Sequence, residues 1–597
     1  MTLSNRDRNL TFAGILLAMF LGALDQTIVS TALPRIVEDL GGLERYAWVF
    51  TAYLVASTVL VPVVGKLADM YSRKTIELVA VSIFLTGSFL CGVAGEFGPL
   101  PLLGDAMNQL IVFRAVQGIG ASGLFSLAFI VIADLYPPAV RGKYQGYVSA
   151  VFGVASILGP LLGGFLTDNA GGIIPGVEGW RWVFYVNVPF GALAIWFIAT
   201  RMPPLRPVGE RGKLDGFAAA LLIGGLVPFT IALQLDRSEY PWGSPVTVGM
   251  LAASLVVLAL FVWRTLRSEY PILDLSLFRN RVFRTASVAT LLHGAAFLST
   301  VAFLPLFVVN VMGVSATGAG LALIPLTLGV TVGAISGGQL VSHIGRYRLL
   351  MLIGGAIFAT GVLLISLLDE NASLGRVSLY MVITGLGVGP ALPLYTLAVQ
   401  NAVDVRRIGQ ATSATQFFRQ IGGAVGTAVL GTVLSTSLAA GFAANLGGLG
   451  ALPPAQQTGE GVSATGDLLA SIRAALDDAR DDLINAVTAG DADATREQLV
   501  ASGVPAAVAD GISTRVEAAS TASERAVLAD ELSDTFDAQA ASVLERVEAG
   551  VELTFAQAVT KVYRYVFFIL LVVIIVSAFI PVLTLRRTFD NVAPEPA

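Results

Sequence analysis

One aspartate, Asp25, lies inside a membrane-length hydrophobic segment that runs from about Thr11 to Leu33 and holds no other charge. A carboxylate at that depth costs on the order of 2.5–3.5 kcal/mol on insertion scales, so such a group usually faces a cavity and has a function. Three roles are open for Asp25: it binds a proton, it contacts a bound small molecule, or it only fixes the position of its helix. We expect the neighbouring Gln26 to line the same cavity.

A second charge, Arg114, lies in the middle of another apolar segment, so its guanidinium needs a partner or a polar cavity wall. Arginine does not titrate, and it could act only by changing the proton affinity of a nearby carboxylate. Asp25 is the natural partner, because we find no other acid deep in the first six hydrophobic segments. Gln117, three residues after Arg114, joins them in the candidate site.

In the second half of the chain, His293 and Arg419 are the polar exceptions in apolar segments. His293 could join a proton path because imidazole titrates near neutral pH, or it could only complete a hydrogen bond. Arg419 could line a cavity or anchor a helix.

The sequence shows no phosphate-binding glycine loop, no nucleophile–base arrangement and no metal-ligand cluster, which disfavours ATP-driven work and catalysis. Two histidines and the single cysteine, Cys91, make a structural zinc site improbable and exclude an intramolecular disulfide. We therefore expect no enzyme activity, metal or cofactor, and an ion gradient as the source of energy.

The elements that must position these residues are membrane-spanning helices. The chain is 55% hydrophobic and only 13% charged, with a mean hydropathy of +0.75, which excludes a soluble enzyme. A span needs roughly 20 mostly apolar residues. Fourteen such windows occur, near residues 11–33, 47–68, 76–95, 107–133, 144–167, 182–200, 216–235, 245–263, 285–311, 317–341, 349–368, 377–400, 410–440 and 562–585.

The basic residues predict the orientation of these spans. With the N-terminus placed in the cytoplasm, the inner segments hold 22 of the 37 lysines and arginines. Both termini are therefore expected in the cytoplasm. The short outer loops hold only Arg35, Arg45, Arg181, Arg237 and Arg376.

One outer segment, residues 441–560, differs from the others. It contains 19 acidic residues and 6 arginines, a net charge of −13, and since the whole chain carries −5 the remainder carries +8. The overall acidity thus belongs to this insert, and no nucleic-acid partner is expected. Apolar residues at three-, four- and seven-residue spacing predict helices in it. The last of these could extend the final span far beyond the membrane, although a helix that bends back as a hairpin is the stronger expectation.

Between the second and third spans, the chain reads Gly65-Lys66-Leu67-Ala68-Asp69-Met70-Tyr71-Ser72-Arg73-Lys74. Small residues allow helix ends to approach one another, and Asp69 and Arg73 can make charge-assisted contacts there. A weaker copy, Gly337 to Arg346, falls between spans ten and eleven. Such an internal echo is typical of repeated transporter halves.

On these motifs the chain resembles the major facilitator superfamily, and specifically its 14-span drug:proton antiporter branch. The loop from Gly65 to Lys74 matches the family's signature loop, and the segments around Asp25 and before Pro189 resemble motifs of that branch. Span four adds Arg114-Ala115-Val116-Gln117-Gly118-Ile119-Gly120. Span five adds the antiporter motif, with Gly153, Gly159, Pro160, Gly163 and Gly164.

The resemblance implies an all-α polytopic fold with two six-helix bundles and alternating access between them. The expected units are 1–203 for the first bundle, 204–268 for two extra spans, 269–440 with 561–588 for the second bundle, and 441–560 for a helical extracytoplasmic insert. The family also implies that Gly65, Asp69, Arg73 and Lys74 form a cytoplasmic gate, with Asp134 as a partner of Arg73. It ties the position of Arg114 to proton transfer and the span-five motif to export.

We therefore expect a proton-driven exporter of amphipathic small molecules in the cytoplasmic membrane of a bacterium. Two alternatives stay open. The substrate could be a lipid or lipid-like metabolite, with the insert guiding it or docking an outer protein partner. More remotely, the chain could be a non-transporting receptor whose insert senses an external ligand.

Overall fold

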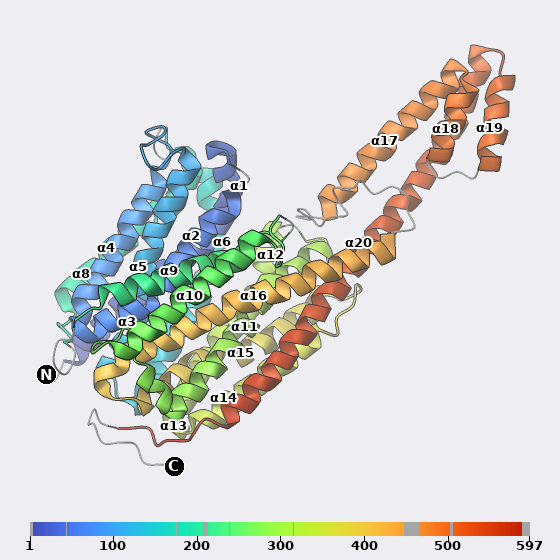
Figure 1. Cartoon of the computed structure of the whole chain (residues 1–597). Helices are drawn as coiled ribbons and strands as arrows, with labels where there is room; N and C mark the ends of the chain where they lie inside the picture. The colour runs from blue at the N-terminus through green and yellow to red at the C-terminus, as the bar shows by residue number, and fades with distance from the viewer. Residues whose placement is uncertain are drawn as a thin grey trace.

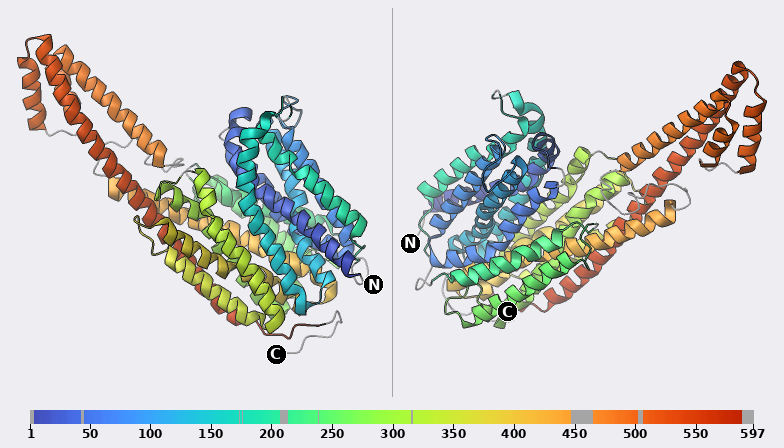
Figure 2. Two further views of the ribbon diagram at one scale, coloured as in Figure 1. Left: turned by 180° about the vertical axis from the view of Figure 1, so that it is seen from behind. Right: turned by 45° about the horizontal axis from the view of Figure 1, so that its top comes forward.

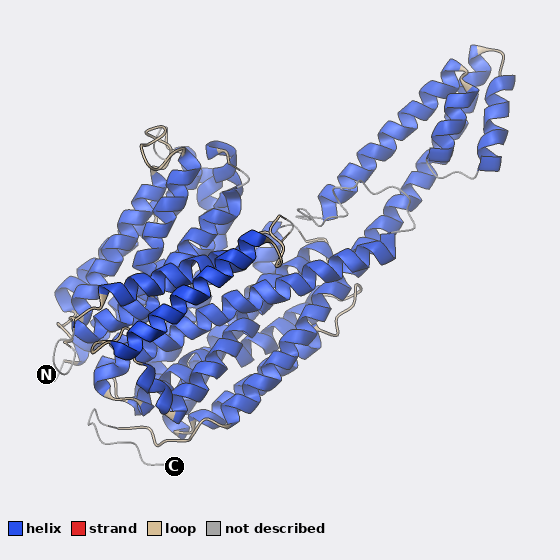
Figure 3. Cartoon of the chain, in the orientation of Figure 1, coloured by secondary structure: helices blue, strands red, loops and turns tan. Residues whose placement is uncertain are grey.

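The computed structural model describes residues 4–42, 45–172, 174, 176–206, 213–237, 239–314, 316–446, 465–501 and 506–587. Fourteen helical segments in it are long and apolar enough to cross a membrane, as expected (Figure 3). Several are longer than the predicted windows because the helices extend past the apolar core. The fold is that of two six-helix bundles with two additional spans.

The first six spans are built from eight α-helices. Span two breaks at Leu60, and Pro62, which has no backbone N–H to donate, lies in the first turn of the next helix. The short 3-10 turn Gly179–Arg181 leads into span six. The helices are α1 (Asn5–Leu40), α2 (Tyr46–Val59), α3 (Val61–Met70), α4 (Arg73–Gly92), α5 (Ala106–Leu135), α6 (Pro138–Asn169), α7 (Trp182–Tyr185) and α8 (Asn187–Arg201).

The remaining spans follow in chain order, with four further helices at the end of the chain that include the insert. They are α9 (Gly216–Gln234), α10 (Pro245–Arg267), α11 (Arg281–Asn310), α12 (Ala316–Ala322), α13 (Ile324–Ile344), α14 (Tyr347–Ile365), α15 (Leu374–Ala402), α16 (Ile408–Leu446), α17 (Thr465–Ala489), α18 (Ala492–Ala501), α19 (Ala506–Ala518) and α20 (Ala522–Ala578).

The two bundles meet at the face of the molecule that holds both chain ends, which we call the terminal face (Figure 1). Their ribbons diverge toward the opposite face, in Figure 1 as in the views of Figure 2. Near the terminal face, α3 packs on α16 and α6 packs on α13. Gln400 of α15 accepts hydrogen bonds from Arg141 (3.3 Å) and Gln145 (2.9 Å) of α6. The extra pair α9 and α10 pack mainly on each other and also join an apolar cluster with α2, α3 and α16.

The insert forms a helical arm that extends from the second bundle, opposite the terminal face (Figures 1 and 2). Helix α20 is continuous over 57 residues, about 85 Å at 1.5 Å per residue, and includes the last span. Helix α17 packs along α20, and α18 and α19 lie at the far end (Figure 1). The projection of the last helix far beyond the bundle is thus confirmed, and the expectation that this helix bends back as a hairpin is wrong, because α20 is continuous and a separate helix, α17, packs along it.

The arm has a small apolar core of its own, separate from the bundles. It contains Leu483 and Val487 of α17 and Leu528 and Leu532 of α20, each at most 7% exposed. At the base of this core, Arg480 donates to Ser533 (3.0 Å) and pairs with Asp537 (3.2 Å). Because exposed ion pairs contribute little, the apolar contacts carry most of the stability of the arm.

Replacing Val487 by Asp tests whether this core stabilises the arm independently of the bundles. An uncompensated buried charge costs about 3–5 kcal/mol, so we expect α17 to detach from α20. Amide hydrogen exchange should then lose protection in α17 and α18 and keep it in α5 and α15. The matched control is Val500→Asp at an exposed position of α18, which should leave protection unchanged. Equal loss of protection in the bundles would contradict an independent arm.

Candidate functional site

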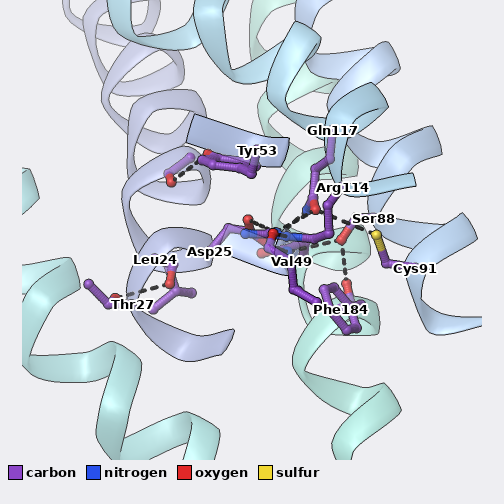
Figure 4. A network of polar contacts seen from close by, with 12 residues as sticks. Leu24, Asp25, Thr27, Val49, Tyr53, Ser88, Cys91, Arg114, Gln117 and Phe184 are labelled. Carbon is purple, nitrogen blue, oxygen red and sulfur yellow. Dashed lines mark hydrogen bonds and ion pairs between the residues drawn. The ribbon is translucent and has the colours of Figure 1, made fainter. Parts of the chain in front are cut away.

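A buried network of polar side chains in the first bundle is centred on Asp25. Its Oδ2 lies 2.5 Å from Nη1 of Arg114, and its Oδ1 accepts a hydrogen bond from Nε2 of Gln117 at 2.7 Å. Nδ2 of Asn187 also donates to Oδ1, at 3.1 Å. Figure 4 shows Asp25 meeting Arg114 and Gln117, which project from one helix. Asp25, Arg114, Gln117 and Asn187 are all 0% exposed.

Further contacts tie this network to five helices of the bundle. Asn187 of α8 also donates to Ser88 of α4 (3.0 Å), and Ser88 donates to the carbonyl of Phe184 (2.9 Å). The Arg114 guanidinium lies 4.3 Å from the ring centre of Tyr53 in α2, a cation–π contact. Tyr53 in turn donates to the carbonyl of Gly22 in α1 (3.2 Å). Side chains from α1, α2, α4, α5 and α8 are therefore linked to the Asp25–Arg114 pair.

The network is nearly but not completely satisfied. Nη2 of Arg114 and Oδ1 of Asn187 are buried without a hydrogen-bond partner in the described part of the chain. A buried ion pair is stable only when its partners stay in place, because removal of one leaves an uncompensated charge. Asp25 is enclosed within the bundle, whereas we expected its side chain to face a cavity. Gln26 was also expected at this site, but it is half-buried and takes no part in this network.

His293 and Arg419 lie in the second bundle, far along the chain from Asp25. Both line a small polar pocket formed by α11, α15 and α16, together with Tyr395 and Gln416, with room for about one water molecule. Nε2 of His293 is buried without a hydrogen-bond partner, and no hydrogen bond or ion pair of Arg419 occurs within the described residues. The structure thus separates the predicted site into two clusters, one in each bundle.

A third cluster lies at the terminal face and contains the predicted gate residues. Asp69, at the end of α3, accepts hydrogen bonds from the backbone N–H groups of Gly409 (2.8 Å) and Gln410 (2.9 Å) in the first turn of α16. A helix N-terminus favours an anion, so this contact joins the two bundles electrostatically. A Cβ at Gly65 would lie 2.9 Å from the carbonyl oxygen of Gly409, so only glycine permits this approach.

Arg73 connects this inter-bundle contact to the first bundle. Its Nε lies 2.9 Å from Oδ2 of Asp134 in α5, and its Nη2 lies 3.9 Å from Oδ1 of Asp69. Lys74 points away from this cluster and donates to the carbonyl of Ala199 in α8 (2.7 Å). Asp69, Arg73 and Asp134 therefore form one group, with Lys74 as a separate anchor between α4 and α8.

The glycines of span five allow α6 to approach two other helices. A Cβ at Gly159 would lie 2.6 Å from Cβ of Thr27, and one at Gly163 would lie 2.5 Å from the carbonyl oxygen of Ile28, both in α1. On the other side, a Cβ at Gly153 would lie 3.2 Å from the carbonyl oxygen of Thr327 in α13. Gly164 has open space around it and makes no such contact. Pro160 lies within α6 next to Gly159.

Sequence reasoning missed several residues that the structure brings to these clusters. Asn187 and Ser88 are uncharged and gave no signal beyond lying in apolar segments. Glu77 could have been found, because it is a charge inside the third predicted span, although it lies near the end of that span. It is 0% exposed in α4. In the described ranges no group of three metal-ligating side chains occurs.

Comparisons with known proteins agree with this fold. The family model of the Major Facilitator Superfamily matches residues 15–427. Multidrug resistance protein 3 of Bacillus subtilis is 39% identical over 70% of this chain and 78% of its own length. The multidrug transporter protein MdtP of the same organism is 36% identical over 72% of this chain and 75% of its own length.

A solved structure shows the same fold at low sequence identity. The proton:xylose symporter XylE superposes with a TM-score of 0.52 at 14% identity, over 74% of this chain and 91% of that one. The family match ends at residue 427, so the arm formed by α17 to α20 lies beyond it. From its sequence, its fourteen spans and these relatives, the chain belongs to the Major Facilitator Superfamily and is a multi-pass membrane transporter.

Proposed function

We propose that this protein is a proton-coupled exporter of amphipathic small molecules, with Asp25 as the proton-binding residue. The single observation that carries the proposal is the buried pair of Asp25 and Arg114. Two similar relatives bear the words "multidrug resistance" or "multidrug transporter" in their names, which supports small-molecule export. One proton that moves down the membrane potential supplies about 2.3 kcal/mol per 100 mV.

In this proposal a proton and Arg114 compete for the same carboxylate. While the ion pair is intact, Asp25 is ionised; protonation neutralises Asp25 and leaves Arg114 buried without its partner. That state is unfavourable unless the surrounding helices rearrange, and the five helices tied to the network would move together. Proton binding at Asp25 would thereby change the conformation of the whole first bundle. Protonation replaces a neutral ion pair by a buried, unpaired cation, and the free-energy cost of that cation drives the conformational change.

The terminal face is cytoplasmic in this proposal, in agreement with the distribution of lysine and arginine. Asp69 on the N-terminus of α16 and the Arg73–Asp134 pair then hold the cytoplasmic side closed. The described conformation corresponds to the outward-facing member of an alternating-access pair. The first bundle (1–203) and the second (269–440 with 561–588) move relative to each other, with 204–268 as added spans. We assign the pocket lined by His293 and Arg419 to the path that protons follow through the second bundle.

The proposal also specifies the partners of the protein and its location in the cell. The protein acts in the cytoplasmic membrane of a bacterium, with membrane lipids around it, protons as the coupling ion and no cofactor. Gln117 carries no charge and belongs to the polar surroundings of Asp25 through its hydrogen bond, whereas Gln26 lies outside this network. Gly153, Gly159, Pro160 and Gly163 keep α6 packed tightly, which prevents a proton leak past α1 and α13, whereas Gly164 faces open space and has no part in this packing.

Replacing Asp25 by Asn tests proton coupling. In proteoliposomes with an imposed pH gradient, the variant should lose gradient-driven uptake of a cationic dye, because an amide cannot exchange a proton in this range. We expect a loss of at least tenfold relative to the wild type. Asp168→Asn, at an exposed position of α6, is the matched control and should transport normally.

Because the Asn variant leaves Arg114 unpaired, its folding is checked by size-exclusion chromatography and thermal unfolding. The double variant Asp25→Asn with Arg114→Gln removes both charges and avoids the uncompensated cation. If either well-folded variant keeps gradient-driven transport, Asp25 is not the coupling residue.

The gate assignment predicts that Asp69→Ala destabilises the closed terminal face. Loss of a carboxylate that caps a helix N-terminus costs about 1–2 kcal/mol, so the closed population should fall five- to thirtyfold relative to the open one. Spin labels at Val140→Cys and Leu349→Cys, both exposed at this face, would report the opening as a longer distance. Asp404→Ala removes a cap within one bundle, at the N–H of Arg406, and should leave the distance unchanged. An unaltered distance in Asp69→Ala would contradict the gate role.

A second candidate function is export of a lipid or lipid-like metabolite, with the arm guiding it or docking an outer protein. An apolar groove of about 420 Å³ favours this candidate, because it lies between α1 and α6 and is lined by side chains such as Phe12, Leu16 and Tyr147. Deletion of residues 450–550 separates the two candidates. Lost lipid transport with intact dye efflux would support lipid export, and unchanged transport of both would assign the arm no role in transport. A pH-gradient-dependent flux would exclude a non-transporting receptor.

A further inference from the structure

Glu77 is the one acid of the first bundle that is fully enclosed and lacks any partner in the described residues. Its side chain is 0% exposed, and neither Oε1 nor Oε2 accepts a hydrogen bond there. Burial of an ionised carboxylate without a partner is far more costly than burial of the neutral acid. In this conformation Glu77 is therefore stable with a proton bound.

The charged and titratable groups on the helices that pack against α4 do not change this conclusion. They belong to α3, α5, α7 and α8, and none of them is hydrogen-bonded or ion-paired to Glu77 within the described chain. Arg114 is paired with Asp25, and Asp134 is paired with Arg73. The complete set is Lys66, Asp69, Arg114, Asp134, Tyr185 and Arg201.

Arg73 lies four residues before Glu77 on the same face of α4, the spacing at which two side chains on a helix can meet. In the closed conformation Arg73 is drawn away toward Asp134 and Asp69, yet its Nη1 is buried without a partner. One helical turn thus holds an unused guanidinium N–H and an unused carboxyl group. They are kept apart by contacts that belong to the gate.

We propose that Glu77 is a second proton-binding site, occupied while the terminal face is closed, and that ionised Glu77 pairs with Arg73 when that face opens. On opening, the O–H bond of Glu77 breaks, its proton passes to water that enters from the cytoplasm, and the remaining carboxylate pairs with the guanidinium of Arg73. Closing reverses both steps. This inference rests on the proposed alternating opening of the terminal face but not on Asp25 as the coupling residue.

The pH dependence follows from this linkage. Because the closed state holds one more proton at Glu77, low pH favours closure and rising pH favours opening. One linked proton shifts the ratio of closed to open molecules by at most about tenfold per pH unit, over the range in which Glu77 titrates. Glu77→Gln imitates the protonated acid, so this contribution should disappear and the closed state should persist at high pH.

The test uses the full chain in lipid nanodiscs with spin labels at Val140→Cys and Leu349→Cys, over a range of pH values. The native Cys91 is 0% exposed and stays unlabelled. Relative to the wild type, Glu77→Gln should lose a lengthening of the distance with rising pH, which is the contribution of Glu77. Glu38→Gln, at an exposed position of α1, is the control and should behave as the wild type. An identical pH response in Glu77→Gln and the wild type would overturn the proposal.

A second measurement needs neither transport nor opening. Infrared spectra of the closed protein should contain the carbonyl-stretch band of a protonated carboxyl group that is absent from Glu77→Gln. No difference between these spectra would overturn the proposal as well. Glu77→Leu, which also cannot ionise, replaces the Gln variant if that variant folds poorly. Failure of Asp25→Asn to abolish drug coupling would contradict the proposed function and leave both of these readouts unaffected.

Discussion

The buried ion pair of Asp25 and Arg114 is the constraint on which the first bundle depends. Neither group has access to water, so the protein itself supplies their partners, which come from α1, α2, α5 and α8. Such an arrangement is costly to build and offers no advantage in stability over well-packed apolar side chains. In the proposed mechanism its value lies in the consequence of disturbing it, because the side chains linked to this one carboxylate come from α1, α2, α4, α5 and α8.

The terminal face applies the same kind of interaction at the junction of the bundles. Asp69 contacts the N-terminus of α16, and Arg73 holds Asp134 on the other side. The contacts of Asp69 are charge-assisted and add to the packing of α3 on α16 and of α6 on α13, so together they stabilise one arrangement of the two bundles. Glu77 adds a titratable group one turn from Arg73. The proposed gate and the proposed proton sites are therefore physically connected through α4, whose Ser88 reaches the Asp25 network at the other end.

Much of the fold could be predicted from the sequence because a membrane restricts the choice to long apolar helices. The fourteen spans, and the helical nature of the insert, followed from hydropathy and periodicity. The pairing of Asp25 with Arg114 was anticipated from the cost of burying each charge. The separation of His293 and Arg419 from Asp25 could not be predicted, because periodicity does not tell which helix faces which partner. Asn187 and Ser88 escaped notice because neutral polar side chains are common in spans, and Glu77 because its position near the end of a span resembled that of a residue at the membrane surface.

The measurement that tests the central claim most directly is proton release when a drug binds to the purified protein in weakly buffered solution. The account predicts that binding expels a proton from wild-type protein at a pH where Asp25 is protonated, and that this release is lost in Asp25→Asn. Arg114→Gln, which removes the competing cation, should shift the release to higher pH. Equal drug-induced proton release by the wild type and Asp25→Asn would contradict the account.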